Sequence, residues 1–330
     1  MIKKIVFGAV ILLVLGISYF AVAYIYPSDL GPKKVSIIIQ YGDSFPSIAQ
    51  KLVEQGVVRS LTMLDLGARF SGVDRKLTPG RYDFTGRNSC RSVLGKLAVA
   101  DFLRIKVTVF EGATIWRVAS VLAEKMEVDS AEVVALNTDT LFLQSLDLPY
   151  LEGYLYPETY IFPWGTELRV IVEAMTDMYA RQTEKIWTDS IPNGLNRDEL
   201  LILASIVEAE ALLSNEMPRI ASVYHNRLSR KMKLDADPTV IYGLGGLDRP
   251  LSRRDLRQST PYNTYRKRGL PPTPINSPSR AAIVAALSPE ESPYLYFVAD
   301  GTGGHRFSRT NAEHNRARRE IRQGLKKSES

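Results

Sequence analysis

Two glutamates interrupt a nearly apolar segment at residues 201–213, and they are the strongest candidates for chemistry in the chain. Apart from Ser205, Glu208 and Glu210 are the only polar side chains of this run. Burying an ionised carboxylate is costly, and burial raises the pKa of a carboxyl group. A carboxylic acid that is still protonated near neutral pH can act as a general acid. The segment therefore predicts an acid–base group, and the alternative is a solvated stripe on a core helix that holds both glutamates.

Helical geometry favours Glu208 over Glu210. Asn196 with Glu199 three positions later is typical of a helix N-terminus, so we predict a helix that begins near Arg197. Positions 208 and 210 then point about 200° apart, and a single cleft can hold only one of them. Glu210 falls nearer the side of Glu199, which we expect to be wetter. Glu208 shares its side with small and apolar residues, namely Leu201, Ala204, Ser205, Ala211 and Leu212.

Aromatic and polar side chains are concentrated in two further segments. Residues 151–160 contain three tyrosines and two acids, a combination that stacks on sugar rings and bonds their hydroxyls, although a Tyr-rich strand ended by Pro157 explains it equally well. Residues 235–274 are rich in Tyr, Asn, Pro and Gly without helical periodicity, which indicates a functional segment. We interpret the second segment as the wall of a binding groove.

The sequence predicts no metal and no cofactor. Asp235 and Asp237 form a D-x-D pair, but an Asp-Pro turn explains it better than a metal site without further ligands nearby. His305 and His314 are two of the three histidines, and zinc would need a third ligand with no evident candidate. The patterns of serine hydrolases and of phosphate-binding loops are absent from the sequence.

Composition indicates a globular protein of two or three domains. The chain has 330 residues, of which 45% are hydrophobic and 24% charged. Its net charge of +6 suits an anionic polymer or a membrane surface, but the basic residues are dispersed and form no nucleic-acid-binding module. A single cysteine, Cys90, excludes an intramolecular disulfide.

The amino terminus predicts a membrane anchor. Residues 5–26 are uncharged and mostly apolar, and about 20 such residues span a bilayer as a helix. Lys3 and Lys4 would hold residues 1–4 in the cytoplasm, with the remainder of the chain outside it. A signal peptide cleaved after Ala21-Val22-Ala23 is the alternative. The apolar run is longer than a signal peptide requires, which favours a single-pass anchor in the cytoplasmic membrane.

The predicted fold class is α+β. After a linker at 27–34, strands at 35–39 and 105–109 each precede a glycine turn and a helix, a repeat that either reflects two related α/β units or arises by chance. Residues 35–104 resemble a LysM-type module, although a plain glycine turn also explains them. Residues 105–330 form a mainly helical catalytic domain with short strands. There, Ser277 should cap one helix, 294–299 and 305–308 should form a hairpin, and Thr310 with Glu313 should begin the last helix.

Taken together, these segments resemble the MltG-type (YceG-like) endolytic murein transglycosylases. The resemblance covers the anchor and most of residues 35–325, although Ala209 stands where the family often has lysine. It implies an inner-membrane enzyme that cuts nascent glycan strands internally, with Glu208 as catalytic acid/base. The matching motifs occur in the expected order: Glu152-Gly-Tyr-Leu-Tyr-Pro157, Ala204-Ser-Ile-Val-Glu208-Ala-Glu210, Asn226-Arg-Leu228, Asp237-Pro-Thr-Val-Ile-Tyr242, Tyr262-Asn-Thr-Tyr265, Gly269-Leu-Pro-Pro-Thr-Pro-Ile-Asn276 and Gly304-His-Arg-Phe307.

The chemistry implied is cleavage of the β-1,4 bond between N-acetylmuramic acid and N-acetylglucosamine without water. One carboxyl group is enough, because the C6 hydroxyl of the muramic acid is the nucleophile and a 1,6-anhydro end results. Peptidoglycan strands are the expected substrate, and peptidoglycan synthases or division proteins the expected partners. The side chains expected to bind the glycan are Glu152, Tyr154, Ser205, Asn226, Asp237, Thr239, Tyr242, Tyr262 and Asn263.

Three alternatives remain at this point. A lysozyme-like hydrolase would pair Glu208 with Asp235 or Asp237 as the second carboxylate. A non-catalytic membrane-anchored scaffold for peptidoglycan binding or division would explain the anchor and the aromatic residues. A membrane-anchored protein that acts on another anionic polymer fits the charge but none of the motifs.

Overall fold

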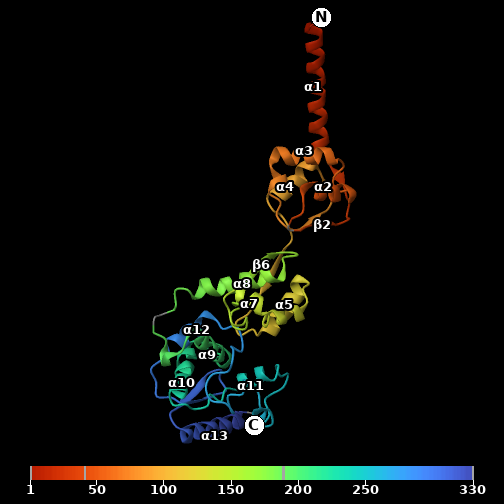
Figure 1. Ribbon diagram of the computed structural model, residues 1–330. Helices are drawn as coiled ribbons and strands as arrows, with labels where there is room; N and C mark the ends of the chain where they lie inside the picture. Colours follow the sequence, from red (N-terminus) through yellow and green to blue (C-terminus); the bar gives the residue numbers. More distant parts are fainter. Residues whose placement is uncertain (1, 41, 188–189, 329–330) are drawn as a thin grey trace. The chain divides into compact units, whose positions relative to one another are not determined.

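The computed structural model describes residues 2–40, 42–187 and 190–328, so Met1 of the predicted cytoplasmic end lies outside the described residues. The chain divides into two compact units, Met1–Lys106 with Ile161–Glu167 and Val107–Tyr160 with Leu168–Ser330. Most of the regular structure is helical, and the described strands form two-stranded sheets (Figure 1). This confirms the predicted α+β class with short strands.

The first unit begins with helix α1, Ile2–Ile25. Among the described residues, no helix has both the length and the hydropathy needed to cross a membrane. The transmembrane helix over residues 5–26 therefore stays a prediction.

A small α/β core follows α1. Val35, Ile37 and Ile39 alternate with exposed residues, so β2 (Val35–Ile39) buries one face and pairs antiparallel with β3 (Gly80–Phe84). Within the predicted linker at 27–34, β1 (Ser28–Asp29) pairs with β4 (Arg87–Asn88). The helices of this core are α2 (Phe45–Glu54), α3 (Leu61–Ser71), η1 (Val73–Arg75) and α4 (Cys90–Ala98).

The chain passes between the two units within β5 (Arg104–Thr108) and β6 (Thr159–Pro163), which pair with each other. In the second unit, α5 packs on α6. The bounds of the helices on this side are α5 (Ile115–Met126), α6 (Ser130–Leu136), α7 (Thr140–Ser145) and α8 (Leu168–Thr183).

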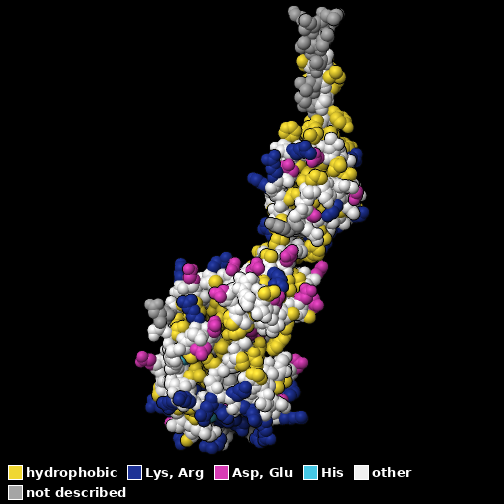
Figure 2. Space-filling view, in the orientation of Figure 1, with side chains coloured by type: hydrophobic (Ala, Val, Ile, Leu, Met, Phe, Trp, Pro, Cys, Tyr) yellow, Lys and Arg dark blue, Asp and Glu magenta, His cyan; other side chains and the backbone are white. Residues whose placement is uncertain are grey.

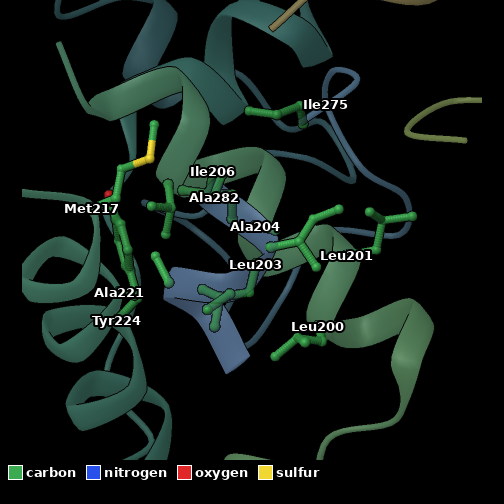
Figure 3. Close-up of a cluster of buried hydrophobic side chains, with 14 of the residues drawn as sticks. Leu200, Leu201, Leu203, Ala204, Ile206, Met217, Ala221, Tyr224, Ile275 and Ala282 are labelled. Carbon is green, nitrogen blue, oxygen red and sulfur yellow. The ribbon is translucent and has the colours of Figure 1, made fainter. Parts of the chain in front are cut away.

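The glutamate helix α9 (Arg197–Glu210) lies at the centre of the second unit. Asn196 and Glu199 form the predicted capping box, so the helix begins where the sequence indicated. Residues 200–207 are all buried, and they pack against α10 (Met217–Ser229) and α12 (Arg280–Leu287) (Figure 3). A helix that is apolar on every side is buried on every side, so α9 has no wet stripe over these two turns.

The remaining elements surround this core. Segment 235–274 contains α11 (Asp237–Gly243) and η4 (Asp255–Arg257), which the sequence did not predict. The predicted hairpin is confirmed as β7 (Tyr296–Ala299) and β8 (His305–Ser308), and Thr310 with Glu313 begins α13 (Asn311–Ser328) as expected. The prediction that Ser277 caps α12 was wrong. Ser279 is the N-cap, whereas the backbone N–H of Ser277 donates to the carbonyl of Ala113. The short turns η2 (Pro192–Gly194) and η3 (Ser214–Glu216) flank α9.

Candidate active site

Glu210, the last residue of α9, lines a cavity of about 490 Å³. This volume falls in the range of about 300–1,000 Å³ that small-molecule sites occupy. The cavity walls come from α10, the segment before α11, the β7–β8 hairpin and α13. The polar and aromatic side chains in its lining are Tyr224, Arg227, Asp235, Asp237, Tyr265, Tyr296, Phe297, His305, Asn311, His314, Asn315 and Arg318.

Glu210 is poised for proton transfer. Burial raises the pKa of this carboxyl to about 7, and the charge of Asp237 adds to the rise, whereas a hydrogen bond from Tyr224 and the charge of Arg227 lower it. The Tyr224 hydroxyl donates to Oε1 at 2.9 Å. A carboxyl group with a pKa near the working pH can both donate and accept a proton. Glu208 and Glu210 are both half-buried, so side-chain exposure does not distinguish the side of Glu210 as the wetter one.

Three charged side chains, Arg227, Asp235 and Asp237, lie in the cavity lining next to Glu210. The Arg227 guanidinium donates to the carbonyls of Leu295 at 2.6 Å and Leu234 at 2.7 Å, and it lies 3.6 Å from Asp235. Burial raises the pKa of Asp235. Asp237 accepts a 2.6 Å hydrogen bond from Tyr265. Of the predicted glycan-binding residues, Asp237 alone belongs to this lining.

Glu208, the predicted catalytic acid, lies elsewhere. Its Oε2 accepts hydrogen bonds from the backbone N–H of Ser279 at 2.9 Å and from the Ser279 hydroxyl at 2.6 Å. Ser279 is the N-cap of α12, so the carboxylate sits at a helix N-terminus, where negative charge is stabilised. Its half-buried side chain is outside the lining of the Glu210 cavity. This geometry is that of a group that joins α9 to α12.

Five of the predicted glycan-binding residues bond to other parts of the protein; four of them are buried and Asn226 is half-buried. Ser205 bonds Ile202 and Ile275, and Asn226 donates to the carbonyls of Ser292 and Tyr294. These contacts fix loops to helices. The Tyr154 hydroxyl donates to Asp198, and the Thr239 hydroxyl donates to the carbonyl of Ala236. The Asn263 amide donates to the carbonyls of Leu256 and Gln258.

The other three, Glu152, Tyr242 and Tyr262, form a separate cluster. Glu152 is 1% exposed and accepts a 2.8 Å bond from the Tyr242 hydroxyl and bonds from the Ile115 backbone. The Tyr242 ring contacts Trp116 at 4.8 Å and Tyr262 at 4.9 Å between centroids. Desolvation raises the pKa of Glu152 to about 7. The cluster ties α5 to α11 and is distinct from the Glu210 lining.

Sequence reasoning preferred Glu208 to Glu210 and did not single out Tyr224 or the wall formed by α13. Tyr265 lies in segment 235–274, which we interpreted as a groove wall, and it does line this cavity. The signal for Glu210 was present, since a segment apolar over two full turns has no wet side on which to place it. The spacing of Asn311, His314, Asn315 and Arg318 also marks one helical face.

Comparisons with known proteins agree with the resemblance in the sequence. The model of the YceG-like family matches residues 37–320, and the chain belongs to this family. The endolytic murein transglycosylase of Bacillus subtilis (strain 168) is 32% identical over 302 residues, which cover 86% of this chain and 84% of that protein.

More distant relatives give the same picture. The endolytic murein transglycosylase of Streptococcus pneumoniae serotype 2 (strain D39) is 26% identical, and the match covers 89% of this chain but only 60% of that longer protein. A crystal structure of a yceG-like protein from Listeria monocytogenes is 28% identical, with a TM-score of 0.58 over 87% of this chain and 99% of that one.

Replacing Glu152 with glutamine should change how stability depends on pH. An acid with a raised native pKa binds more protons when folded than when unfolded between about pH 4.5 and 7, so wild-type stability falls as pH rises through that window. Glu152→Gln removes this titration and can still accept the Tyr242 bond. Relative to the variant, the wild type should lose about 3 kcal/mol by pH 8.

Urea unfolding at pH 4.5 and pH 8 measures this difference. Glu184→Gln, at an exposed position, serves as the control and should follow the wild type. If the stability gap between Glu152→Gln and wild type stays constant with pH, the raised pKa of Glu152 is refuted.

Proposed function

We propose that this protein is an endolytic murein transglycosylase that uses Glu210, in place of the predicted Glu208, as its acid/base. The observation that carries the assignment is the desolvated Glu210 carboxyl in a cavity of about 490 Å³. The family membership and the relatives of that activity support the reaction. Glu208 is outside the lining of this cavity, and Ser279 donates two hydrogen bonds to one of its oxygens.

The reaction needs one proton-shuttling group. Protonated Glu210 donates to the glycosidic oxygen as the bond from that oxygen to C1 of N-acetylmuramic acid breaks. The C6 hydroxyl oxygen of the same sugar then bonds to C1 and gives its proton to the Glu210 carboxylate. The acid is regenerated, and the strand ends in 1,6-anhydro-N-acetylmuramic acid. The ring closure consumes no water. Because the enzyme cuts within the strand, the reaction shortens glycan strands.

The surface around the cavity suits an anionic substrate. Figure 2 shows lysine and arginine side chains gathered on the face of the second unit that carries α13. Arg316, Arg318, Arg319 and Arg322 of that helix are exposed, and Arg318 lines the cavity without an ion pair among the described residues. Carboxylates of the peptide stems on peptidoglycan would meet positive charge here. Peptidoglycan synthases or division proteins are the partners that we propose for such an enzyme.

The first unit would bind and localise the enzyme. We propose that residues 35–104 act as the LysM-like peptidoglycan-binding module. Residues 5–26 would anchor the protein in the cytoplasmic membrane, with the second unit on the outer side. Phe7, Leu12 and Val22 of α1 are 68%, 72% and 62% exposed, as lipid-facing side chains would be.

Deleting residues 1–26 should move the protein from the membrane to the soluble fraction without loss of activity on isolated glycan strands. Fractionation of cells and a cleavage assay on both forms test this expectation. A full-length chain that alkaline carbonate extracts from membranes would contradict the anchor.

A lysozyme-like hydrolase is the second candidate, because Asp235 and Asp237 line the same cavity as Glu210. Such an enzyme would use one aspartate as nucleophile or base and would leave reducing ends. Mass spectrometry of the products separates the two, since anhydro ends are lighter by one water.

Glu210→Gln should abolish the release of anhydro muropeptides from uncross-linked glycan, by about 10³-fold or more, because glutamine cannot shuttle a proton. Glu208→Gln is the matched control, two residues away on the same helix. It retains an oxygen for Ser279 and should keep most of the activity, with some loss of thermal stability. The reverse result, an inactive Glu208 variant and an active Glu210 variant, would return the assignment to Glu208.

Tyr224→Phe should shift the pH dependence of cleavage. Activity requires protonated Glu210 and should fall as pH rises through about 7. The Tyr224 hydrogen bond lowers the pKa of Glu210, so its removal should move this falling limb to higher pH by about half a unit to one unit. A profile of kcat/KM against pH measures the shift, and an unchanged limb would dissociate it from Glu210.

A further inference from the structure

His305 belongs to the motif Gly304-His-Arg-Phe307, and the proposed transglycosylase mechanism assigns it no task. It begins β8, lines the Glu210 cavity, and its side chain is 7% exposed. The ring lies edge-on to Phe297 at 5.2 Å between centroids, and Phe297 lies edge-on to Tyr224, the partner of Glu210. The imidazole therefore belongs to the same wall as the proposed acid.

Glu216 holds this histidine at two points. One carboxylate oxygen accepts the His305 backbone N–H at 3.0 Å, and the other accepts Nδ1 at 2.7 Å. The approach is close, since a Cβ on Gly304 would lie 3.2 Å from Glu216 and 3.1 Å from Asp300. The hairpin turn is fixed as well, because Asp300 accepts bonds from Thr302 and Gly304.

This arrangement determines which ring nitrogen is available. A carboxylate only accepts hydrogen bonds, so the proton of the neutral imidazole resides on Nδ1 and Nε2 carries a lone pair. Among the described residues, no protein group bonds Nε2. A ring held on one side, with an unbonded acceptor on a cavity lining, is built to receive a hydrogen-bond donor from a ligand.

We propose that His305 is a substrate-binding residue whose Nε2 accepts a hydrogen bond from a sugar hydroxyl, and that Glu216 is the positioning residue that fixes its tautomer. This inference rests on the proposed function, because it takes the ligand of the Glu210 cavity to be a saccharide. The contact fixes a sugar ring against the hairpin wall while Glu210 acts on the glycosidic bond.

Two substitutions separate this role from a structural one. His305→Asn places its amide where Nδ1 was, so it keeps a partner for Glu216 but has no atom at the Nε2 position. His305→Gln reaches the Nε2 position but loses the bond to Glu216. If His305 binds substrate, Asn should lower kcat/KM about tenfold or more, mainly through KM, and Gln should stay closer to wild type. The melting temperature of the Asn variant should remain near that of wild type.

The inference would be overturned if His305→Asn kept the wild-type kcat/KM and His305→Gln lowered it, because only the bond to Glu216 would then matter. Equal activity of wild type and both variants would overturn it too. Binding of an uncleaved murein tetrasaccharide to Glu210→Gln, with and without His305→Asn, provides a second readout, with about tenfold weaker binding expected for the double variant. A cleaving Glu210→Gln protein would instead count against the proposed function.

Discussion

The site depends on the removal of water from one carboxyl group at the end of a buried helix. Residues 200–207 of α9 are buried on every side, and the helix ends at Glu210. Because the preceding two turns are fixed in the core, Glu210 emerges where α10, the hairpin and α13 enclose a cavity. Desolvation there raises its pKa to about 7, which a solvated helix terminus would not do.

The surrounding elements hold this environment in place. Helix α10 supplies Tyr224, which bonds Glu210, and Arg227, which bonds the carbonyls of Leu234 and Leu295 on two separate segments. The Arg227 guanidinium lies 5.2 Å from the Tyr296 ring and so fixes β7 as well. A single helix thus orients the acid and secures two of the walls around it.

Local patterns were readable from the sequence, whereas the surroundings of individual side chains were not. The capping box at Asn196 and the hairpin at 296–308 depend on neighbouring residues, and the structure contains both. The choice between Glu208 and Glu210 depended on the packing of α10, the next helix, and of α12 and α13, which are far away in the chain. The polar residues Ser205, Asn226 and Asn263 were predicted to bind sugar, but bonds to backbone occupy them. These bonds are long-range for Ser205 and Asn226 and local for Asn263.

The two glutamates of α9 show how the surroundings divide similar groups between different tasks. Glu208 accepts two hydrogen bonds from the N-cap of α12 and so joins two helices. Desolvation of Glu210 and the charge of Asp237 favour its neutral form, against the single hydrogen bond from Tyr224, so a proton is available. Two glutamates two positions apart on one helix thus take different tasks, one as a link between helices and one as an acid, because their surroundings differ.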